Sequence, residues 1–515
     1  MLSQNISIFH KLKNFISYIF INFPKISAFS LGCLMKFCFC KGSTYPILLF
    51  FIFPLLFVIL QKSIKKQSFF IGFSFGMGYF SSTLYWIAES FKCVGFGNYG
   101  YLAVALLVLY LSIYPGLTCC FTKRFATTRI SFILLFSTFW TISEILRGII
   151  FTGFPWNLIG YVAYDIPYFS QIADIFGVYG ISFLLILIIG LISLKKTIIY
   201  GIIILFLNIL YGYYKINLYN GYITPESETD ITIVQPSISQ ENKLSIEKFK
   251  ENIDLHIKLS KVQNHLYTGS RLIIWPEAAI NIPISSKGEL LKYITSQITQ
   301  NNTYIISGCD RFDKNKKLYN SLVVLGKNGE IKKIYDKRHL LPFGEFIPER
   351  LLNLGIKKLT AGITNFSKGT LKRTIKLNNI SYFDCVICYE MAFPGEIIDN
   401  HESKWILNIT NDAWFNNSDG PTQHLKIACF RAIEEGKMII RCANNGISAI
   451  INCNGKLIKT LKTNEINSID YKVPEKYHNT IFSIYKNNII LIILIILITI
   501  LSFLFLAKKS KIKIF

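Results

Sequence analysis

Acidic residues are scarce in the first part of this 515-residue chain. Residues 1–215 contain only four, Glu89, Glu144, Asp165 and Asp174, whereas the whole chain contains 31. Charged residues make up 17% of the chain, against about 25% in an average globular protein, while 51% of the residues are hydrophobic. This composition excludes a disordered or fibrous chain, and the uneven distribution of acids excludes a single water-soluble domain. It predicts a polytopic membrane protein with one large water-soluble segment.

Two common signatures of catalytic function are also missing. The sequence contains no GxxxxGK[ST] loop and no HExxH motif, which excludes the P-loop nucleotide hydrolases and the zincin metalloproteases. Cys385 and Cys388 form a Cys-x-x-Cys pair, but no second such pair or zinc-spaced His pair follows them. A redox pair or half of a zinc site is therefore disfavoured.

The net charge of +24 does not indicate nucleic-acid binding. Residues 1–220 carry 16 basic and 4 acidic residues, and the tail from Lys486 carries five basic residues and no acid. Most of the excess positive charge therefore lies beside apolar stretches, where the positive-inside rule explains it. We expect no nucleic-acid partner.

The long apolar stretches predict about eight membrane spans, because a span needs about 20 mostly apolar residues. The candidates lie near 14–40, 46–61, 68–88, 100–121, 130–150, 175–194, 197–214 and 489–507, the first being the weakest. They divide the chain into a transmembrane domain (1–215), an external domain (216–486), and a last span with a basic tail (487–515).

Basic residues in the connecting loops predict the orientation. If eight spans alternate, one side receives Lys11 and Lys13, Lys62 to Lys66, Lys123 to Arg129, Lys195 and Lys196, and the lysines from Lys508 onward. The positive-inside rule places this side in the cytoplasm. In a bacterium the external domain then lies on the periplasmic face of the cell (inner) membrane.

The segment that contains Glu144 and Arg147 suggests a polar feature within the membrane part. These residues are one helical turn apart, so an ion pair is favoured over a direct functional role. The apolar and aromatic loop that follows predicts an interfacial segment with Trp156 as its anchor. We include Trp156 among the supporting or substrate-binding candidates, although aromatic-belt anchoring alone also explains it.

The external domain alternates β-rich runs with polar helical stretches, which is typical of an α/β domain. Strands are predicted at 230–238, 271–280, 303–312, 320–326, 382–390, 404–410 and 447–453. Helices are predicted at 245–265, 287–300 and 421–437.

Three reactive side chains are predicted near the ends of these strands. Glu277 follows a hydrophobic run, Lys337 lies in a turn-rich segment, and Cys388 comes near the end of "YFDCVICYE". A thiol with a free pKa of about 8.5 needs a base, which Glu277 can provide, and a cation such as Lys337 can stabilise thiolate and oxyanion. A cysteine at this position is more often a small core residue, so the pattern alone does not establish catalysis.

The motifs around these residues resemble those of the nitrilase (carbon–nitrogen hydrolase) superfamily. "IIWPEAAI", "YDKRHLLPFGEFIP" and "DCVICYEMAFP" carry a Glu–Lys–Cys triad. Together with "SEILRGIIFTGFPW", "NITNDAWF" and "RCANNGISAII", they make nearly the whole chain resemble the apolipoprotein N-acyltransferases. The resemblance implies an αββα sandwich outside the membrane and requires no metal or other cofactor.

The resemblance also implies a two-stage reaction. Cys388 attacks an ester of a phospholipid to form a thioester, with Glu277 as general base and Lys337 on the oxyanion. The α-amine of a diacylated apolipoprotein then takes the acyl chain. Glu345 matches a supporting glutamate, and Tyr389 and Glu390 match the residues after the nucleophile.

One position departs from the family pattern, and two other functions stay open. Leu244 stands where the family usually has a tryptophan in a loop expected to help hold lipid. The first alternative is a membrane-anchored amidase or nitrilase that uses the same triad on a water-soluble substrate. The second is a catalytically inactive lipid-binding or transport protein, whose spans offer only Glu89 and Glu144 as lining charges.

Overall fold

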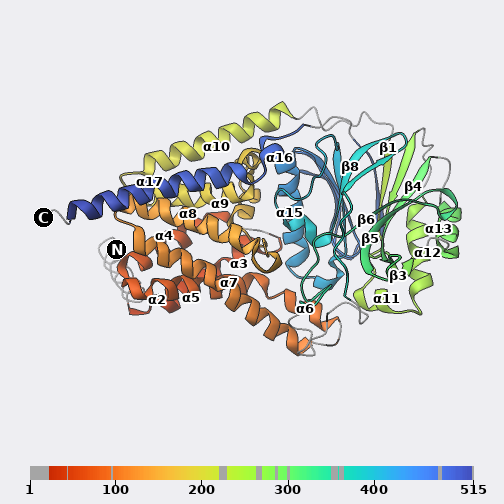
Figure 1. Cartoon of the computed structure of the whole chain (residues 1–515), viewed down its shortest axis with the longest axis horizontal. Helices are drawn as coiled ribbons and strands as arrows, with labels where there is room; N and C mark the ends of the chain where they lie inside the picture. Colours follow the sequence, from red (N-terminus) through yellow and green to blue (C-terminus); the bar gives the residue numbers. More distant parts are fainter. Residues whose placement is uncertain are drawn as a thin grey trace, which may run out of the picture.

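The computed structural model describes residues 22–42, 45–93, 95, 97–219, 229–261, 269–284, 288–298, 302–348, 358, 365–473 and 478–512. A bundle of long helices forms one end of the molecule and a β-sandwich forms the other (Figure 1). The last helix of the chain returns from the sandwich to the far end of the bundle (Figure 1).

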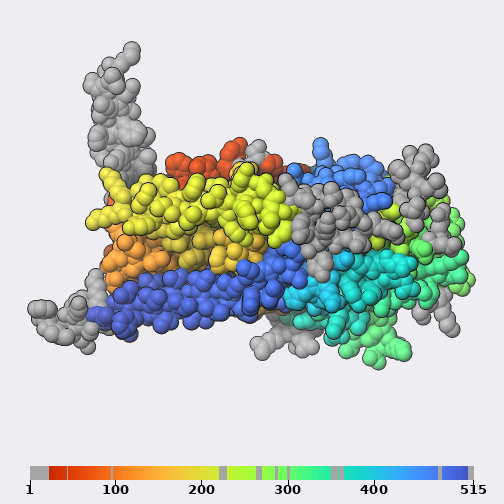
Figure 2. All heavy atoms as spheres, turned by 90° about the horizontal axis from the view of Figure 1, so that it is seen from above, coloured from red at the N-terminus to blue at the C-terminus, as the bar shows by residue number. Residues whose placement is uncertain are grey.

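The bundle contains five helices that are long and apolar enough to cross a membrane: Gly97–Phe125, Arg129–Arg147, Phe169–Ile192, Ile198–Leu218 and Asn488–Ala507. Its helices are α2 (Pro24–Leu34), α3 (Lys36–Phe39), α4 (Leu49–Lys62), α5 (Ser68–Leu84), α6 (Ile87–Lys92), α7 (Gly97–Phe125), α8 (Arg129–Arg147), α9 (Ala173–Ile192), α10 (Ile198–Leu218) and α17 (Asn488–Ile512). Helices α10 and α17 run along one side of the bundle as long ridges that end where the sandwich begins (Figures 1 and 2). Their large apolar side chains are mostly exposed, as expected for helices that face lipid.

The count of eight spans is not confirmed. The region predicted as the first span contains two short helices, α2 and α3, and residues 14–21 lie outside the described part. The second and third predicted spans are Pro46–Lys62 and α5, both 17 residues long. At 1.5 Å per residue such helices reach only about 25 Å, which is short of the roughly 30 Å hydrocarbon core. Lys11, Lys13 and Lys513, used to predict the orientation, also lie outside the described residues.

Glycines allow the first helices of the bundle to touch. A Cβ atom on Gly78 of α5 would lie 2.1 Å from the carbonyl oxygen of Phe29 in α2. A Cβ atom on Gly72 would lie 2.2 Å from the carbonyl oxygen of Pro115 in α7. At both positions the glycine backbone leaves no room for a side chain beside the neighbouring helix backbone. Helices α2 and α7 therefore pack directly on α5 through small residues, as membrane helices commonly do.

Two mixed sheets form the sandwich. The first has the order β13-β1-β2-β4-β5-β6, with β3 paired to β4, and the second has the order β12-β11-β10-β9-β8-β7. The central pairs are parallel and the outer pairs are antiparallel. The strands are β1 (Thr229–Gln235), β2 (Ser270–Ile274), β3 (Ile280–Ile284), β4 (Thr303–Phe312), β5 (Leu318–Leu325), β6 (Ile331–Asp336), β7 (Thr374–Leu377), β8 (Ile380–Ile387), β9 (Trp405–Thr410), β10 (Met438–Ala443), β11 (Ser448–Ile451), β12 (Leu457–Leu461) and β13 (Asn467–Lys472).

Helices cover both outer faces, so the domain has four layers, αββα. Apolar residues from both sheets, among them Leu272 and Leu407, form the core between the sheets. Helices α12 (Phe249–Ser260) and α13 (Glu289–Ile298) pack on the first sheet. Helix α15 (Gly420–Glu435) packs on the second sheet and belongs to the same buried cluster as the bundle. The sandwich therefore sits directly on the bundle.

The predicted strands are present, with two errors at functional positions. The run 271–280 is not one strand: β2 ends at Ile274 and β3 begins at Ile280. Pro276 interrupts it because proline has no N–H for the ladder. The run 382–390 ends early, because β8 stops at Ile387 and Cys388 begins the 3-10 turn η8 (Cys388–Ala392).

Candidate active site

The sandwich places each of the three predicted reactive side chains just beyond the end of a strand. Lys337 directly follows β6, Cys388 directly follows β8, and Glu277 lies three residues beyond β2. Strands β2 and β6 belong to one sheet and β8 to the other. The acid and the amine thus come from one sheet, and the thiol comes from the other.

Glu277 and Lys337 lie in a buried polar network with Glu345. Lys337 Nζ is 3.2 Å from Glu277 Oε1 and 2.9 Å from Glu345 Oε1. Asn320 Nδ2 donates to the same two carboxylate oxygens, at 2.9 and 2.8 Å. The backbone N–H of Asn411 donates to Glu277 Oε2 at 2.9 Å. Burial opposes the charge of Lys337, but the two carboxylates prevail and raise its pKa well above the ordinary lysine value.

Cys388, at the start of the turn η8, adopts a strained backbone conformation. Its φ of 51° lies in the left-handed region, where a non-glycine residue is uncommon. Its side chain is partly buried, and burial and the Glu277 carboxylate raise the pKa of the thiol, against the lowering effect of Lys337. The resting group is therefore a neutral thiol at physiological pH. A base must take its proton when it attacks, and Glu277 is the nearby carboxylate that can do so.

Glu390 joins the segments that follow Cys388 and Lys337. Its Oε1 accepts hydrogen bonds from the backbone N–H groups of Arg338 (2.8 Å) and His339 (3.1 Å), and its Oε2 accepts one from Ile387 (2.8 Å). Arg373 NH1 lies 3.1 Å from Oε2. Glu390 therefore fixes the relative position of the two segments that carry Lys337 and Cys388, a role that is invisible in the sequence.

Two family models match the chain, each over one part of it. The apolipoprotein N-acyltransferase N-terminal domain matches residues 31–191, and the carbon–nitrogen hydrolase model matches residues 230–477. A Rickettsia typhi protein named apolipoprotein N-acyltransferase is 35% identical over 503 residues, which cover 91% of this chain and 96% of the relative. A protein of the same name from Wigglesworthia glossinidia brevipalpis is 35% identical over 451 residues, covering 84% and 88%. The chain belongs to the apolipoprotein N-acyltransferase family.

The protein is therefore a membrane acyltransferase with a carbon–nitrogen hydrolase domain. A solved amidase of the nitrilase superfamily from Nesterenkonia is also similar, at 15% identity and a TM-score of 0.33, covering 49% of this chain and 93% of the amidase. Among the residues that the structure describes, no three His, Cys, Asp or Glu side chains are grouped to hold a metal ion.

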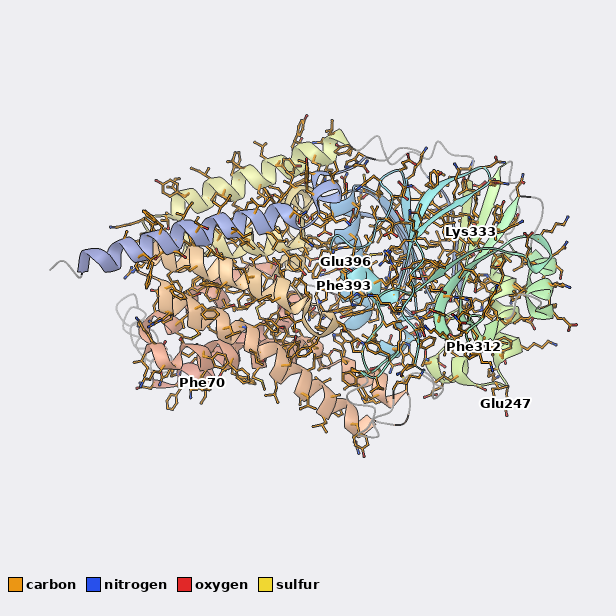
Figure 3. The ribbon with its side chains drawn as sticks, viewed as in Figure 1. Phe70, Glu247, Phe312, Lys333, Phe393 and Glu396 are labelled. Atoms are coloured by element: carbon orange, nitrogen blue, oxygen red, sulfur yellow. The ribbon has the colours of Figure 1, made fainter. Side chains whose placement is uncertain are left out.

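In this acyltransferase the turn that carries Cys388 contacts the membrane bundle. The Tyr389 hydroxyl donates to the carbonyl oxygen of Gly153 at 3.0 Å. Trp156 stacks on Tyr389 and also contacts the ring of His424. Trp156 is 3% exposed, so the predicted interfacial anchor is wrong: the side chain is buried against the catalytic domain. Phe393 and Glu396, which follow Cys388 in the chain, lie at the junction between bundle and sandwich (Figure 3).

The ion pair predicted in the membrane part is present but weak. Arg147 NH2 lies 4.0 Å from Glu144 Oε1. Arg147 instead donates to the carbonyl oxygens of Phe154 (3.0 Å), Trp156 (2.7 Å) and Asn157 (3.1 Å). It thereby holds the loop that supports Tyr389.

Two residues beside the candidate triad, Asn320 and His424, were not identified from the sequence. Asn320 lies inside β5, where a strand pattern gives no functional signal. His424 Nε2 lies 3.2 Å from the carbonyl oxygen of Cys388, and its Nδ1 lies 3.0 Å from Asp412. Burial lowers the pKa of His424, and the neighbouring Arg441 guanidinium lowers it further, so the imidazole is neutral at pH 7. Leu244, in place of the expected tryptophan, ends α11 (Gln240–Leu244) with 38% of its surface exposed.

Proposed function

We propose that the protein moves a fatty acyl chain from a phospholipid to the α-amine of an N-terminal S-diacylglycerylcysteine, through a thioester on Cys388. The observation that carries this proposal is the place of the nucleophile. Cys388 lies close enough to the Glu277–Lys337 pair for both charges to act on its thiol. It is also on a turn that contacts the membrane bundle through Tyr389 and Gly153. A site at this junction suits substrates that are anchored in lipid.

In the first stage Glu277 takes the thiol proton while the Cys388 sulfur attacks the ester carbonyl. The Lys337 ammonium stabilises the oxyanion, and Glu345 and Asn320 keep Lys337 and Glu277 in place. The C–O bond then breaks, and Glu277 returns the proton to the leaving glycerol oxygen. The products are an acyl-enzyme and a lysophospholipid.

In the second stage the amine of the lipoprotein attacks the thioester. Glu277 accepts a proton from nitrogen, the C–S bond breaks, and the proton passes to the Cys388 sulfur. The junction with the bundle favours this acceptor over water, because apolar surroundings limit hydrolysis of the thioester. The partners are thus a phospholipid donor, a diacylated apolipoprotein and the surrounding lipids.

We further propose that the external domain comprises residues 216–486 and lies on the periplasmic face of the bacterial inner membrane. Helices α7 and α9 end, and α8 and α10 begin, at the end of the bundle away from the sandwich (Figure 1). The basic residues Lys123, Arg124, Lys195 and Lys196 follow or end α7 and α9. The positive-inside rule places that end in the cytoplasm.

The acyl-enzyme provides the test. Protein purified from membranes should carry a long acyl chain on Cys388 that neutral hydroxylamine removes, and Cys388→Ala should carry none. Mass spectrometry of the Cys388 peptide measures the adduct. Cys385→Ala is the matched control, because this buried thiol is three residues away and should not alter labelling. If the wild-type protein never carries the adduct and lipoproteins stay diacylated in its presence, the proposal fails.

The same measurement discriminates the two alternatives. A membrane-anchored amidase would hydrolyse a soluble amide and would not accumulate a long-chain thioester. A catalytically inactive transport or lipid-binding protein would release its lipid on denaturation, because no covalent bond would form.

A further inference from the structure

One carboxylate near the catalytic network has no hydrogen-bond or ion-pair partner among the residues that the structure describes. It belongs to Asp310, on β4, directly opposite Asn320 on β5 in the antiparallel register. Opposed residues of such a pair point to the same face of the sheet. Asp310 therefore shares the face of Asn320, which donates to both Glu277 and Glu345.

The neighbours of Asp310 on β4 point to the other face of the sheet. Arg311 pairs with Asp336, with NH2 2.7 Å from Oδ2. Cys309 is fully buried in the outer core beneath α12 and α13. Of these three residues, Asp310 is therefore the one that faces Asn320 and the site.

Asn320 offers a second acceptor without a donor. Because its Nδ2 donates to the two glutamates, its Oδ1 is directed elsewhere, and this buried oxygen has no hydrogen-bond partner in the described part of the chain. A buried acceptor that lacks a donor destabilises the fold unless a ligand or water fills the place. The partly exposed Asp310 carboxylate and the buried Asn320 Oδ1 together offer acceptors to a group that only donates hydrogen bonds.

The lysines of the site do not fill this place. Lys337 Nζ is committed to Glu277 and Glu345, and Lys243 Nζ donates to the carbonyl oxygen of Glu277 at 2.7 Å. Lys358 Nζ lies over the Phe366 ring, 4.7 Å from its centroid, and has no hydrogen-bond partner among the described residues. Burial raises the pKa of Asp310 to about 6, although Lys243 and Lys358 lower it, so the carboxylate is mostly ionised at pH 7.

We propose that Asp310 binds the α-ammonium group of the acceptor in the second stage, with Asn320 Oδ1 as the adjacent acceptor. This inference rests on the proposed function. An α-amine with an ordinary pKa of about 7.7–8.0 arrives mostly protonated, with three N–H donors and no acceptor. It must also lose a proton before it can attack the thioester.

The proton balance of the step follows from these groups. The ammonium gives one proton to the Asp310 carboxylate, and the freed nitrogen lone pair forms the C–N bond with the thioester carbon. Glu277 accepts the second proton from nitrogen, the C–S bond breaks, and Glu277 passes that proton to the Cys388 sulfur. Asp310 releases its proton to water. The products are the amide, the free thiol and one proton.

A comparison of two nucleophiles tests the assignment. Purified enzyme is first loaded from a fluorescent phospholipid, and single-turnover release of the acyl group is followed in the full-length protein. One reaction contains a synthetic diacylated lipopeptide with a free α-amine, and the other contains neutral hydroxylamine, which has no ammonium to bind. We expect Asp310→Asn to lower the ratio of the lipopeptide rate to the hydroxylamine rate by about tenfold or more, because a charge-assisted hydrogen bond is lost.

Further variants separate binding from folding. Asp310→Glu keeps the charge and should recover part of the ratio. Glu330→Gln removes an exposed carboxylate from the surface pair with Lys332 and should leave the ratio at the wild-type value. An unchanged ratio in Asp310→Asn, or an equal fall for both nucleophiles, overturns the inference while the wild-type thioester still supports the proposed function. A wild-type enzyme that forms no thioester overturns both.

Discussion

At the scale of single residues, Glu390 carries the sharpest structural prediction. Its carboxylate accepts three backbone hydrogen bonds from the segments beside Lys337 and Cys388, and it pairs with the buried Arg373. We expect Glu390→Gln to destabilise the protein by about 3 kcal/mol, because Arg373 loses its counter-charge while buried. Thermal unfolding in detergent should show a midpoint several degrees lower, and thioester formation should slow.

The stability difference between wild type and Glu390→Gln should depend on pH in one direction. Burial opposes the charge of Glu390, but Arg373 and the hydrogen bonds prevail and lower its pKa. A lowered pKa stabilises the fold above the ordinary glutamate value of about 4.3, and this contribution disappears as the pH falls through the folded value. The difference in free energy of unfolding between wild type and Glu390→Gln should therefore be constant from about pH 7 to 5 and become smaller below about pH 4. Glu396→Gln is the control, because Glu396 is an exposed carboxylate six residues further along the chain. An equal loss of stability with the same pH dependence in Glu396→Gln would contradict this assignment.

The sequence located only part of this site, for physical reasons. Lys337 and Cys388 directly follow hydrophobic strands, and Glu277 lies close beyond one, so their positions could be predicted from the pattern. Asp310 and Asn320 lie inside strands, where a polar residue has no distinguishing spacing. Their shared face depends on the β4–β5 register, which the sequence does not specify. The catalytic roles themselves stay predictions.

At the scale of elements, α8 and the loop after it connect the membrane bundle to the turn that carries Cys388. Arg147, the last residue of α8, donates to three carbonyl oxygens between Phe154 and Asn157. We expect Arg147→Lys to lower stability by about 2–4 kcal/mol, because a lysine cannot reproduce the forked contacts and leaves buried carbonyls unpaired. Acyl transfer should fall as well, since the loop supports Tyr389.

Thermal unfolding and thioester loading measure both effects. Arg129→Lys is the matched control, because Arg129 is the exposed first residue of the same helix. Wild-type behaviour of Arg147→Lys in both measurements would show that the loop is held by other contacts, such as the Trp156–Gln423 hydrogen bond.

Long elements were easier to predict than short ones. The apolar composition of α7, α9, α10 and α17 identified them, because length and hydropathy suffice to predict a helix that can cross a membrane. The edge strands β7 and β12, "TIKL" and "LIKTL", were not predicted, because they are short and partly exposed and alternate with lysine. They form because each pairs in an antiparallel ladder with a buried neighbouring strand, β8 beside β7 and β11 beside β12.

At the scale of the whole molecule, the charges of the bundle predict its sidedness. Lys123 Nζ donates to the carbonyl oxygen of Gln61, so the ends of α4 and α7 meet. These ends and the α9–α10 connection lie away from the sandwich (Figure 1). Moving such a cluster of cations across a bilayer is costly, so this end should stay in the cytoplasm with the end of α17.

A pair of reporters checks this orientation in bacterial cells. Green fluorescent protein fused after Phe515 should fluoresce, because it folds in the cytoplasm. Alkaline phosphatase inserted at Lys314, an exposed turn between β4 and β5, should be active, because it needs the oxidising exterior. In a control, both Lys195 and Lys196 are changed to glutamine. This change should weaken the preference for the proposed orientation without reversing it, since the basic clusters at Lys62 and Lys123 persist. Phosphatase activity at the C-terminus together with an inactive insertion at Lys314 would place the Cys388 site on the cytoplasmic face and refute the proposed topology.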